Sequence, residues 1–185
     1  MKRTITQDIL TWSKYFIEKP NVNLGNLPVC PFAKKTREED KLKIVEVKDS
    51  KDFLNEVVDQ AKQFGKYDVV IVACADLYIT ADELNDYVHA LNKVFVREDV
   101  YLIASYPDDE EIDFLESDDF EPDNEFYMVL IQSYQKLEDG SSSLRKTNYY
   151  EHWSNDYFAD TVLVRQQYGD IHGKRNDSWL CIEAR

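Results

Sequence analysis

One stretch of eight residues, 68–75, restricts the folds open to this chain more than any other part of it. It reads Asp68-Val69-Val70-Ile71-Val72-Ala73-Cys74-Ala75, so seven consecutive apolar residues follow one acid. A strand in which apolar and polar side chains do not alternate is buried on both faces, which is typical of the centre of a sheet covered by helices. Helical periodicity precedes and follows this stretch. We therefore expect the order strand, helix, strand, helix, strand around it.

The neighbouring elements are well marked. Strands are predicted over 42–47 and 100–105, a helix over 51–64, and a second helix that begins with a capping box at Thr80 and Glu83. Consecutive strands joined by helices are parallel and right-handed in nearly all known cases. We therefore predict a three-layer α/β domain with a mainly parallel sheet (βαβαβ plus one further strand over 126–134) and helices on both faces. The direction of the further strand stays open.

The rest of the chain predicts helices and loops around this sheet. Ile5, Ile9, Trp12 and Phe16 share one stripe of an amphipathic helix over 6–17. Residues 21–35 read as a loop that packs on the body, and residues 139–143 as a flexible loop. Ser154 caps a last helix that ends near residue 168. With 185 residues, 43% of them hydrophobic, the chain suits a single domain over 1–185, with its core at about 8–137 and a helical extension at about 150–170.

Charge is concentrated in one segment. The net charge is −14, and residues 108–125 contain eleven acids and no base. Such a field repels phosphate backbones, so we expect no direct nucleic-acid binding. No apolar run reaches the roughly 18 residues that cross a bilayer, and the first residues lack the apolar segment of a signal peptide. Three widely spaced cysteines suggest free thiols. We expect a cytoplasmic protein that binds no membrane.

A short motif carries a resemblance to a known family. Residues 25–34 contain G-x-x-x-x-C-P-F-A-K, ending Cys30-Pro31-Phe32-Ala33-Lys34. With the Trp12 helix, the two strand and helix units that follow, and the strand end at Ala104-Ser105, this motif resembles an uncharacterised bacterial family, the domain of unknown function 1415. The resemblance covers about residues 8–137. It implies a single α/β domain and brings no known activity with it.

The chain departs from that family's pattern at three places. Leu27-Pro28-Val29 precedes the cysteine where the family has Asn-Leu, Cys74-Ala75 stands where it has His-Pro, and Tyr106-Pro107 where it has Phe-His-Pro. If those histidines do chemistry in the family, this protein has lost that chemistry.

The first candidate site lies where the predicted strands end. In an open parallel sheet, ligands bind outside the carboxyl ends of the strands. A pocket there would combine Cys30, Lys34, Asp76 and Tyr106 as catalytic residues, with Cys30 as a thiolate stabilised by cations. The alternative is a buried structural cysteine, because a catalytic thiol normally needs a histidine partner and none is placed to serve.

Two histidine and carboxylate pairs flank the last predicted helix, namely Glu151-His152 and Asp170 with His172. They could ligate a metal, but a helix of this length separates them by about 22 Å. We therefore expect no metal site. The chain also lacks a P-loop, G-x-G-x-x-G, G-x-S-x-G and H-E-x-x-H, so we expect no cofactor.

The second candidate site is the acidic segment 108–125. It mixes acids with aromatic residues, a composition typical of a segment that docks on a basic, partly apolar partner. The residues predicted to bind that partner are Asp109, Glu111, Phe114, Asp118 and Phe120. The alternatives are a surface loop that only aids solubility, mimicry of nucleic-acid phosphates toward a DNA-binding protein, and Ca²⁺ binding, for which the spaced D-x-D-x-D-G pattern is absent.

These features lead to two ranked hypotheses of function. The first is a non-catalytic interaction or regulatory module that binds a basic protein through the acidic segment. The second is a small thiol-dependent enzyme with a pocket around Cys30.

Overall fold

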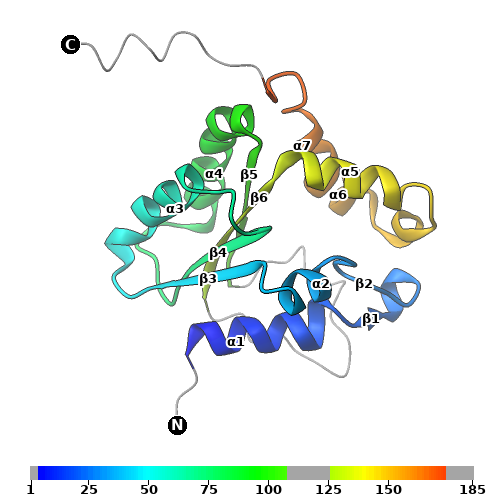
Figure 1. The fold of residues 1–185 in the computed structure, drawn as a ribbon, viewed down its shortest axis with the longest axis horizontal. Helices are drawn as coiled ribbons and strands as arrows, with labels where there is room; N and C mark the ends of the chain where they lie inside the picture. Colours follow the sequence, from blue (N-terminus) through cyan, green and yellow to red (C-terminus); the bar gives the residue numbers. More distant parts are fainter. Residues whose placement is uncertain (1–3, 108–125, 174–185) are drawn as a thin grey trace.

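A four-stranded sheet forms the centre of the computed structural model, which describes residues 4–107 and 126–173 (Figure 1). The order of its strands is β3-β4-β6-β5. Their bounds are Leu42–Val47 for β3, Val69–Cys74 for β4, Val100–Ser105 for β5 and Tyr127–Ser133 for β6. All four strands lie where the apolar runs predict them, and β4 is the buried central run.

The prediction of a mainly parallel sheet is wrong. β3 and β4 are parallel, but β6 lies between β4 and β5 and is antiparallel to both. The crossover rule relates the directions of β4 and β5, which do agree, but it does not require the two strands to be neighbours. β6 takes the place between them because its side chains are buried on both faces, with Met128, Val129 and Ile131 fully covered.

Two helices cover one face of the sheet. They are α3, Phe53–Lys62, which the short 3-10 helix η3 at Ser50–Asp52 precedes, and α4, Ala81–Phe95, which η4 at Val96–Glu98 follows. The capping box of Thr80 and Glu83 begins α4 as predicted. Phe53, Val57 and Leu84 are fully buried and form one core with side chains of β4, β5 and β6.

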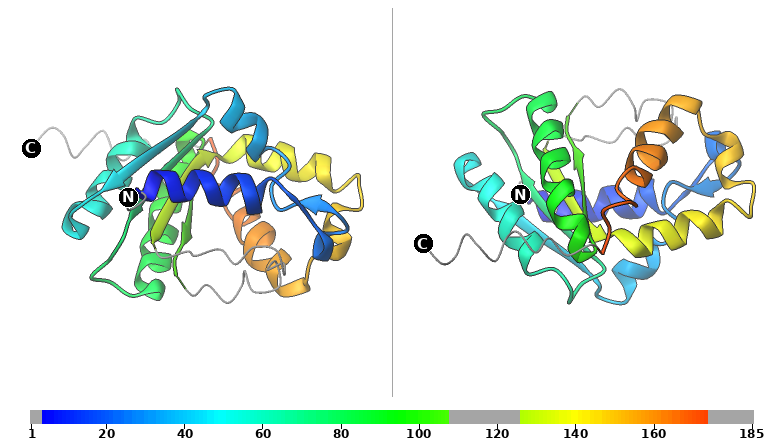
Figure 2. Two further views of the ribbon diagram at one scale, coloured as in Figure 1. Left: turned by 90° about the horizontal axis from the view of Figure 1, so that it is seen from below. Right: turned by 90° about the horizontal axis from the view of Figure 1, so that it is seen from above.

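Helix α1, Ile5–Trp12, covers part of the opposite face and continues into the π-helical turn η1, Ser13–Ile17. Seen from below, α1 crosses the sheet (Figure 2). Ile9 is fully buried against Ile71, Ala73 and Met128. The predicted amphipathic stripe therefore covers the sheet.

The segment after α1 packs on the body and contains short elements that the sequence pattern does not reveal. These are β1 at Pro20–Asn21, η2 at Val22–Leu24, β2 at Leu27–Pro28 and helix α2 at Ala33–Glu38. β1 and β2 pair as a two-stranded antiparallel sheet. Leu24 is fully buried against Phe16, which fixes this segment to the end of α1.

Helices of the C-terminal part lie beside β5 and β6 (Figure 2). They are α5 at Tyr134–Leu144, η6 at Tyr149–His152, α6 at Asn155–Phe158, η7 at Ala159–Leu163 and α7 at Val164–Gln166. Ser154 caps α6 as predicted. Tyr101 of β5 contacts Tyr134 and Tyr168 and so joins these helices to the sheet.

The predicted flexible loop over 139–143 is instead part of α5. Tertiary contacts hold it helical despite a glycine and three serines in succession. Gly140 lies so close to the Phe32 ring that a Cβ atom there would come within 3.1 Å of it. The hydroxyl of Ser141 is buried and accepts a hydrogen bond from Arg165.

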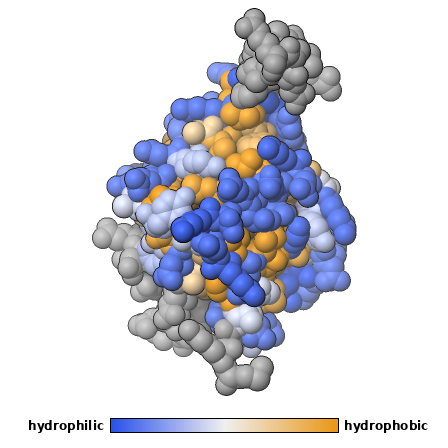
Figure 3. Space-filling view, turned by 90° about the vertical axis from the view of Figure 1, so that its left-hand side faces the viewer, coloured by the Kyte–Doolittle hydropathy of each residue, from blue (hydrophilic) through white to orange (hydrophobic). Residues whose placement is uncertain are grey.

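Figure 3 turns the left-hand side of Figure 1 to the viewer and shows apolar surface between polar side chains. Within residues 4–107 and 126–173, none of the helices combines the length and the apolar character that a membrane crossing requires.

Candidate functional site

A shallow depression lies where β3 and β4 end, and we call it the strand-end depression. Its volume is about 330 Å3, and it is lined by Lys48, Asp49, Ser50, Cys74, Ala75 and Asp76. Asp49 also caps η3, because its carboxylate accepts a hydrogen bond from the Lys51 backbone. The ends of two parallel strands thus bring two acids, one lysine and one thiol together.

The Cys74 thiol in this depression is held in its protonated form. It is buried, and its Sγ–H donates to the backbone oxygen of Asp76 over 3.1 Å. Burial raises the pKa of Cys74, hydrogen bonds with the backbone of Asp76 and Ala75 oppose this effect in part, and the negative charges of Asp76 and Asp49 add to it. A thiol of raised pKa is a weak nucleophile at neutral pH.

Cys30 lies elsewhere, in the turn between β2 and α2. Its backbone N–H donates to Ile17 and its carbonyl accepts from Ala33. Burial raises the pKa of the Cys30 thiol, and the charge of Glu18 adds to this effect, whereas hydrogen bonds from the backbone of Phe32 and Ala33 oppose it. The net direction is opposite to that required of an activated thiolate.

The four predicted catalytic residues do not share the strand-end depression. Asp76 lines it, whereas Cys30, Lys34 and Tyr106 are not among its lining residues. Lys34 belongs to α2. Tyr106 follows β5, and its hydroxyl accepts a hydrogen bond from Asn85 of α4 over 3.3 Å.

The acidic segment and its predicted contact residues Asp109, Glu111, Phe114, Asp118 and Phe120 lie outside the described residues. The strands on either side of it are described. β5 ends at Ser105 and β6 begins at Tyr127, and the two strands are adjacent and antiparallel. Both ends of the connection therefore meet the sheet at the edge where β4 also ends, since Cys74 pairs with Tyr127.

The histidine and carboxylate pairs do not meet. His172 Nε2 lies 3.0 Å from Asp99 Oδ1, next to the start of α5. His152 instead lies against Gly25. Nowhere in the described part of the chain do three metal-ligating side chains form a group.

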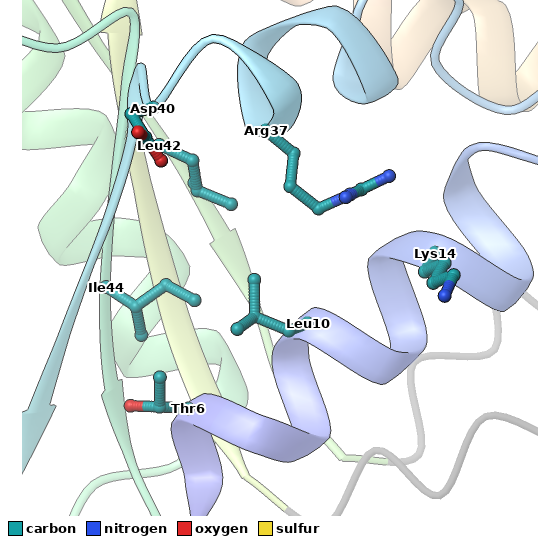
Figure 4. A pocket seen from close by; sticks show the side chains of 7 residues that line it. All are labelled: Thr6, Leu10, Lys14, Arg37, Asp40, Leu42 and Ile44. Carbon is teal, nitrogen blue, oxygen red and sulfur yellow. The ribbon is translucent and has the colours of Figure 1, made fainter.

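Sequence reasoning missed a larger groove, which we call the β3 groove. Its volume is about 440 Å3, and it is lined by Thr6, Leu10 and Lys14 of α1, Arg37 of α2, and Asp40, Leu42 and Ile44 at β3. Leu42 and Ile44 point from β3 toward Leu10 (Figure 4). The alternation of apolar Leu42 and Ile44 with Lys43 is its only signal in the sequence, because the groove exists only if β3 is at the end of the sheet.

One end of the β3 groove is fixed by a strong ion pair. Arg37 donates from Nε and Nη2 to the two carboxylate oxygens of Glu18, at 2.7 and 2.8 Å. This hydrogen-bonded pair lowers the pKa of Glu18. It ties α2 to the end of α1 and so holds the walls of the groove together.

Comparison with protein-family models finds no match for this chain, and comparisons with curated proteins and with solved structures find none either. The resemblance to the domain of unknown function 1415 family therefore stays a prediction.

Proposed function

We propose that this protein is a non-catalytic interaction or regulatory module whose acidic segment 108–125 binds a basic protein. The observation that carries the proposal is the connection between β5 and β6. Adjacent antiparallel strands can be joined by a turn of about two to five residues. Here the 21 residues from 106 to 126 join them, and eleven acids with no base lie among residues 108–125. Closing the sheet requires neither this length nor this charge, and a basic partner surface would account for both.

The chemistry of the thiols supports this choice over the thiol-dependent enzyme. The pKa of Cys30 and that of Cys74 are both raised by burial. The depression at the strand ends holds one of the four predicted catalytic residues. We therefore propose no catalytic role for Cys30. Because Cys30 and Cys74 are free thiols, we also propose a cytoplasmic location, where thiols stay reduced.

The proposal can be tested with three forms of the protein. The first is the unchanged chain, the second has the eleven acids of 108–125 replaced by Asn and Gln, and the third carries Phe114→Ser and Phe120→Ser with every charge kept. Each is immobilised, and the proteins it captures from a cell extract are identified by mass spectrometry. We expect the unchanged chain to capture a basic protein. The form without the eleven acids should fail to capture this protein, and the form with Phe114→Ser and Phe120→Ser should bind it more weakly. If the neutral form captures every partner of the unchanged chain, the proposal fails.

A further inference from the structure

We propose that the free edge of β3 binds an extended segment of a partner protein as an added antiparallel strand, with apolar side chains of that segment in the β3 groove. This surface is separate from the acidic segment 108–125. The inference therefore goes beyond the interaction proposed above and does not depend on it.

The first argument is the state of the β3 edge. β3 ends the sheet, and its ladder of hydrogen bonds runs to β4 alone within residues 4–107 and 126–173. Half of the backbone N–H and C=O groups of such a strand point away from the sheet and can pair with another chain. Proteins often prevent this with a short strand, a proline, a bulge or charged side chains on the edge strand. β3 carries two such charges, Lys43 and Glu46, so an added strand has to satisfy them. β3 has six residues, no proline, and an uninterrupted one-to-one register with β4.

The second argument is the groove beside this edge. Leu10 of α1 is 37% exposed and faces Leu42 and Ile44 of β3 across the β3 groove (Figure 4). A strand added to β3 would place every second side chain on this side of the sheet. Apolar side chains there would fill the groove and cover Leu10. Strand addition uses the backbone for affinity and pockets of this kind for specificity.

The third argument concerns charge. It disfavours a second copy of β3 as the strand that pairs with the free edge. Lys43 is on the α3 side of the sheet, where its Nζ donates to Gln60 over 2.8 Å. Glu46 is on the α1 side with Leu42 and Ile44, because side chains alternate along a strand. Two copies of β3 paired about a two-fold axis align residues of the same side only, so Lys43 never faces Glu46. Within Leu42–Val47, each charge would then face an apolar residue or a charge of the same sign.

A different segment can satisfy both charges. It needs an acid opposite Lys43 on the α3 side and a base opposite Glu46 on the α1 side. Apolar residues opposite Leu42 and Ile44 would then enter the β3 groove. Read from its N-terminus, such a strand is Val-Lys-Val-Ile-Glu-Leu. Opposite charges facing each other across strands stabilise the pair, and like charges destabilise it.

The experiment measures the Kd of two fluorescent peptides by anisotropy with the full chain. The matched peptide is Val-Lys-Val-Ile-Glu-Leu between Gly-Ser flanks, and the control exchanges its Lys and Glu, which keeps the composition. We expect the matched peptide to bind at least about fivefold more tightly, since two facing pairs change sign. The double variant Lys43→Glu with Glu46→Lys should invert this preference. Equal binding of both peptides, or binding of neither, would overturn the proposal.

Two further measurements test the strand and the groove separately. N-methylation of the matched peptide at odd or at even positions should abolish binding in one case only, because alternate amides face β3. Leu10→Ser should weaken binding, whereas Leu163→Ser, a leucine of similar exposure outside the β3 groove, should not. Leu10→Ser and Leu163→Ser therefore test the role of the β3 groove even if the charge-reversed variant fails to fold.

The remaining outcomes are also decisive. A dimer in sedimentation that Leu10→Ser dissociates, without peptide binding, would assign the edge to a second copy and overturn the proposal. Peptide binding that survives neutralisation of segment 108–125 would support it and would separate it from the interaction proposed above. Peptide binding lost on that neutralisation would contradict it.

Discussion

Arg165 Nε lies 2.6 Å from Glu138 Oε1, and this ion pair joins α7 to α5. Arg165 is only 4% exposed, and its Nη2 also donates to the hydroxyl of Ser141. A buried ion pair often contributes little more than apolar residues of the same size would, but the loss of one partner leaves an uncompensated charge. The contact thus fixes the helical extension to α5, and replacing either partner alone should destabilise the protein.

We expect Arg165→Met to lower the free energy of unfolding by about 3 kcal/mol, because Glu138 would stay partly buried without its partner. Adding Glu138→Leu should restore part of this loss. Urea unfolding followed by tryptophan fluorescence measures both. The control is Lys136→Met: the ion pair between Lys136 and Asp68 has side chains 68% and 38% exposed, so its loss should cost less than about 1 kcal/mol. Equal losses for the two variants would show that burial of the pair does not matter.

The ion pair of Glu18 and Arg37 predicts a loss of stability in acid. Hydrogen bonds from Arg37, and then from Ser13, hold the pKa of Glu18 below its ordinary value. A carboxylate whose pKa is lowered by folding stabilises the protein above its unfolded pKa of about 4.3, and this contribution is lost as the pH falls through the folded pKa. The free energy of unfolding should therefore decrease as the pH is lowered below about 4.3.

Glu18→Gln isolates this contribution. At pH 7 we expect it to lower the free energy of unfolding by about 1 kcal/mol, and to make stability depend less on pH below about 4.3. Urea unfolding at several pH values from neutral to acid measures the effect. Glu38→Gln is the matched control, because the Glu38 carboxylate is more exposed and lies 3.8 Å from Arg37. A Glu18→Gln protein with the same acid sensitivity as the unchanged chain would contradict the prediction.

The four strands of the central sheet could be predicted from the sequence, whereas the order in which they pair could not. The strands over 42–47 and 100–105 match β3 and β5, because burial on one or both faces leaves a local pattern. The position of β6 between β4 and β5 leaves none, since strand order depends on packing between distant residues. Helix α5 was missed at 139–143 for a related reason: its Ser141 is held by Arg165, 24 residues later.

The candidate site shows the same limit. Cys74 and Asp76 could be placed at a strand end from the sequence, and they do line the strand-end depression. The raised pKa of Cys30 could not be foreseen from nearby Lys34, because it depends on burial and on Glu18, which is distant in sequence. The β3 groove could not be predicted either, because its prediction requires both the order of the strands and the position of α1 on the sheet.

The raised thiol pKa values predict slow alkylation of the native protein. In a Cys181→Ser background, which leaves Cys30 and Cys74, both thiols should react with iodoacetamide much more slowly at pH 7 than an unperturbed thiol of pKa about 8.5. Because burial raises their pKa, the rate at each pH should stay below that of an unperturbed thiol, and unfolding in urea should remove the difference. Mass spectrometry of peptides locates the modified residue. Fast modification of Cys30 below pH 7 would instead identify an activated thiolate.

The close approach of Gly25 to His152 predicts that Gly25→Ala destabilises the protein and that a second substitution, His152→Ala, relieves part of this loss. Gly25 has φ +63°, and a Cβ atom there would overlap the His152 imidazole. We expect Gly25→Ala to lower the free energy of unfolding by about 2 kcal/mol, through left-handed backbone strain and displacement of the ring. Gly173→Ala, at φ +67° and with no atom of residues 4–107 or 126–173 within 4 Å of the added Cβ, carries the backbone strain alone and should cost about 1 kcal/mol. In a His152→Ala background, the cost of Gly25→Ala should fall to that of Gly173→Ala. Urea unfolding of the four proteins of this cycle measures the coupling, and a cost that is independent of His152 would show that the ring does not constrain Gly25.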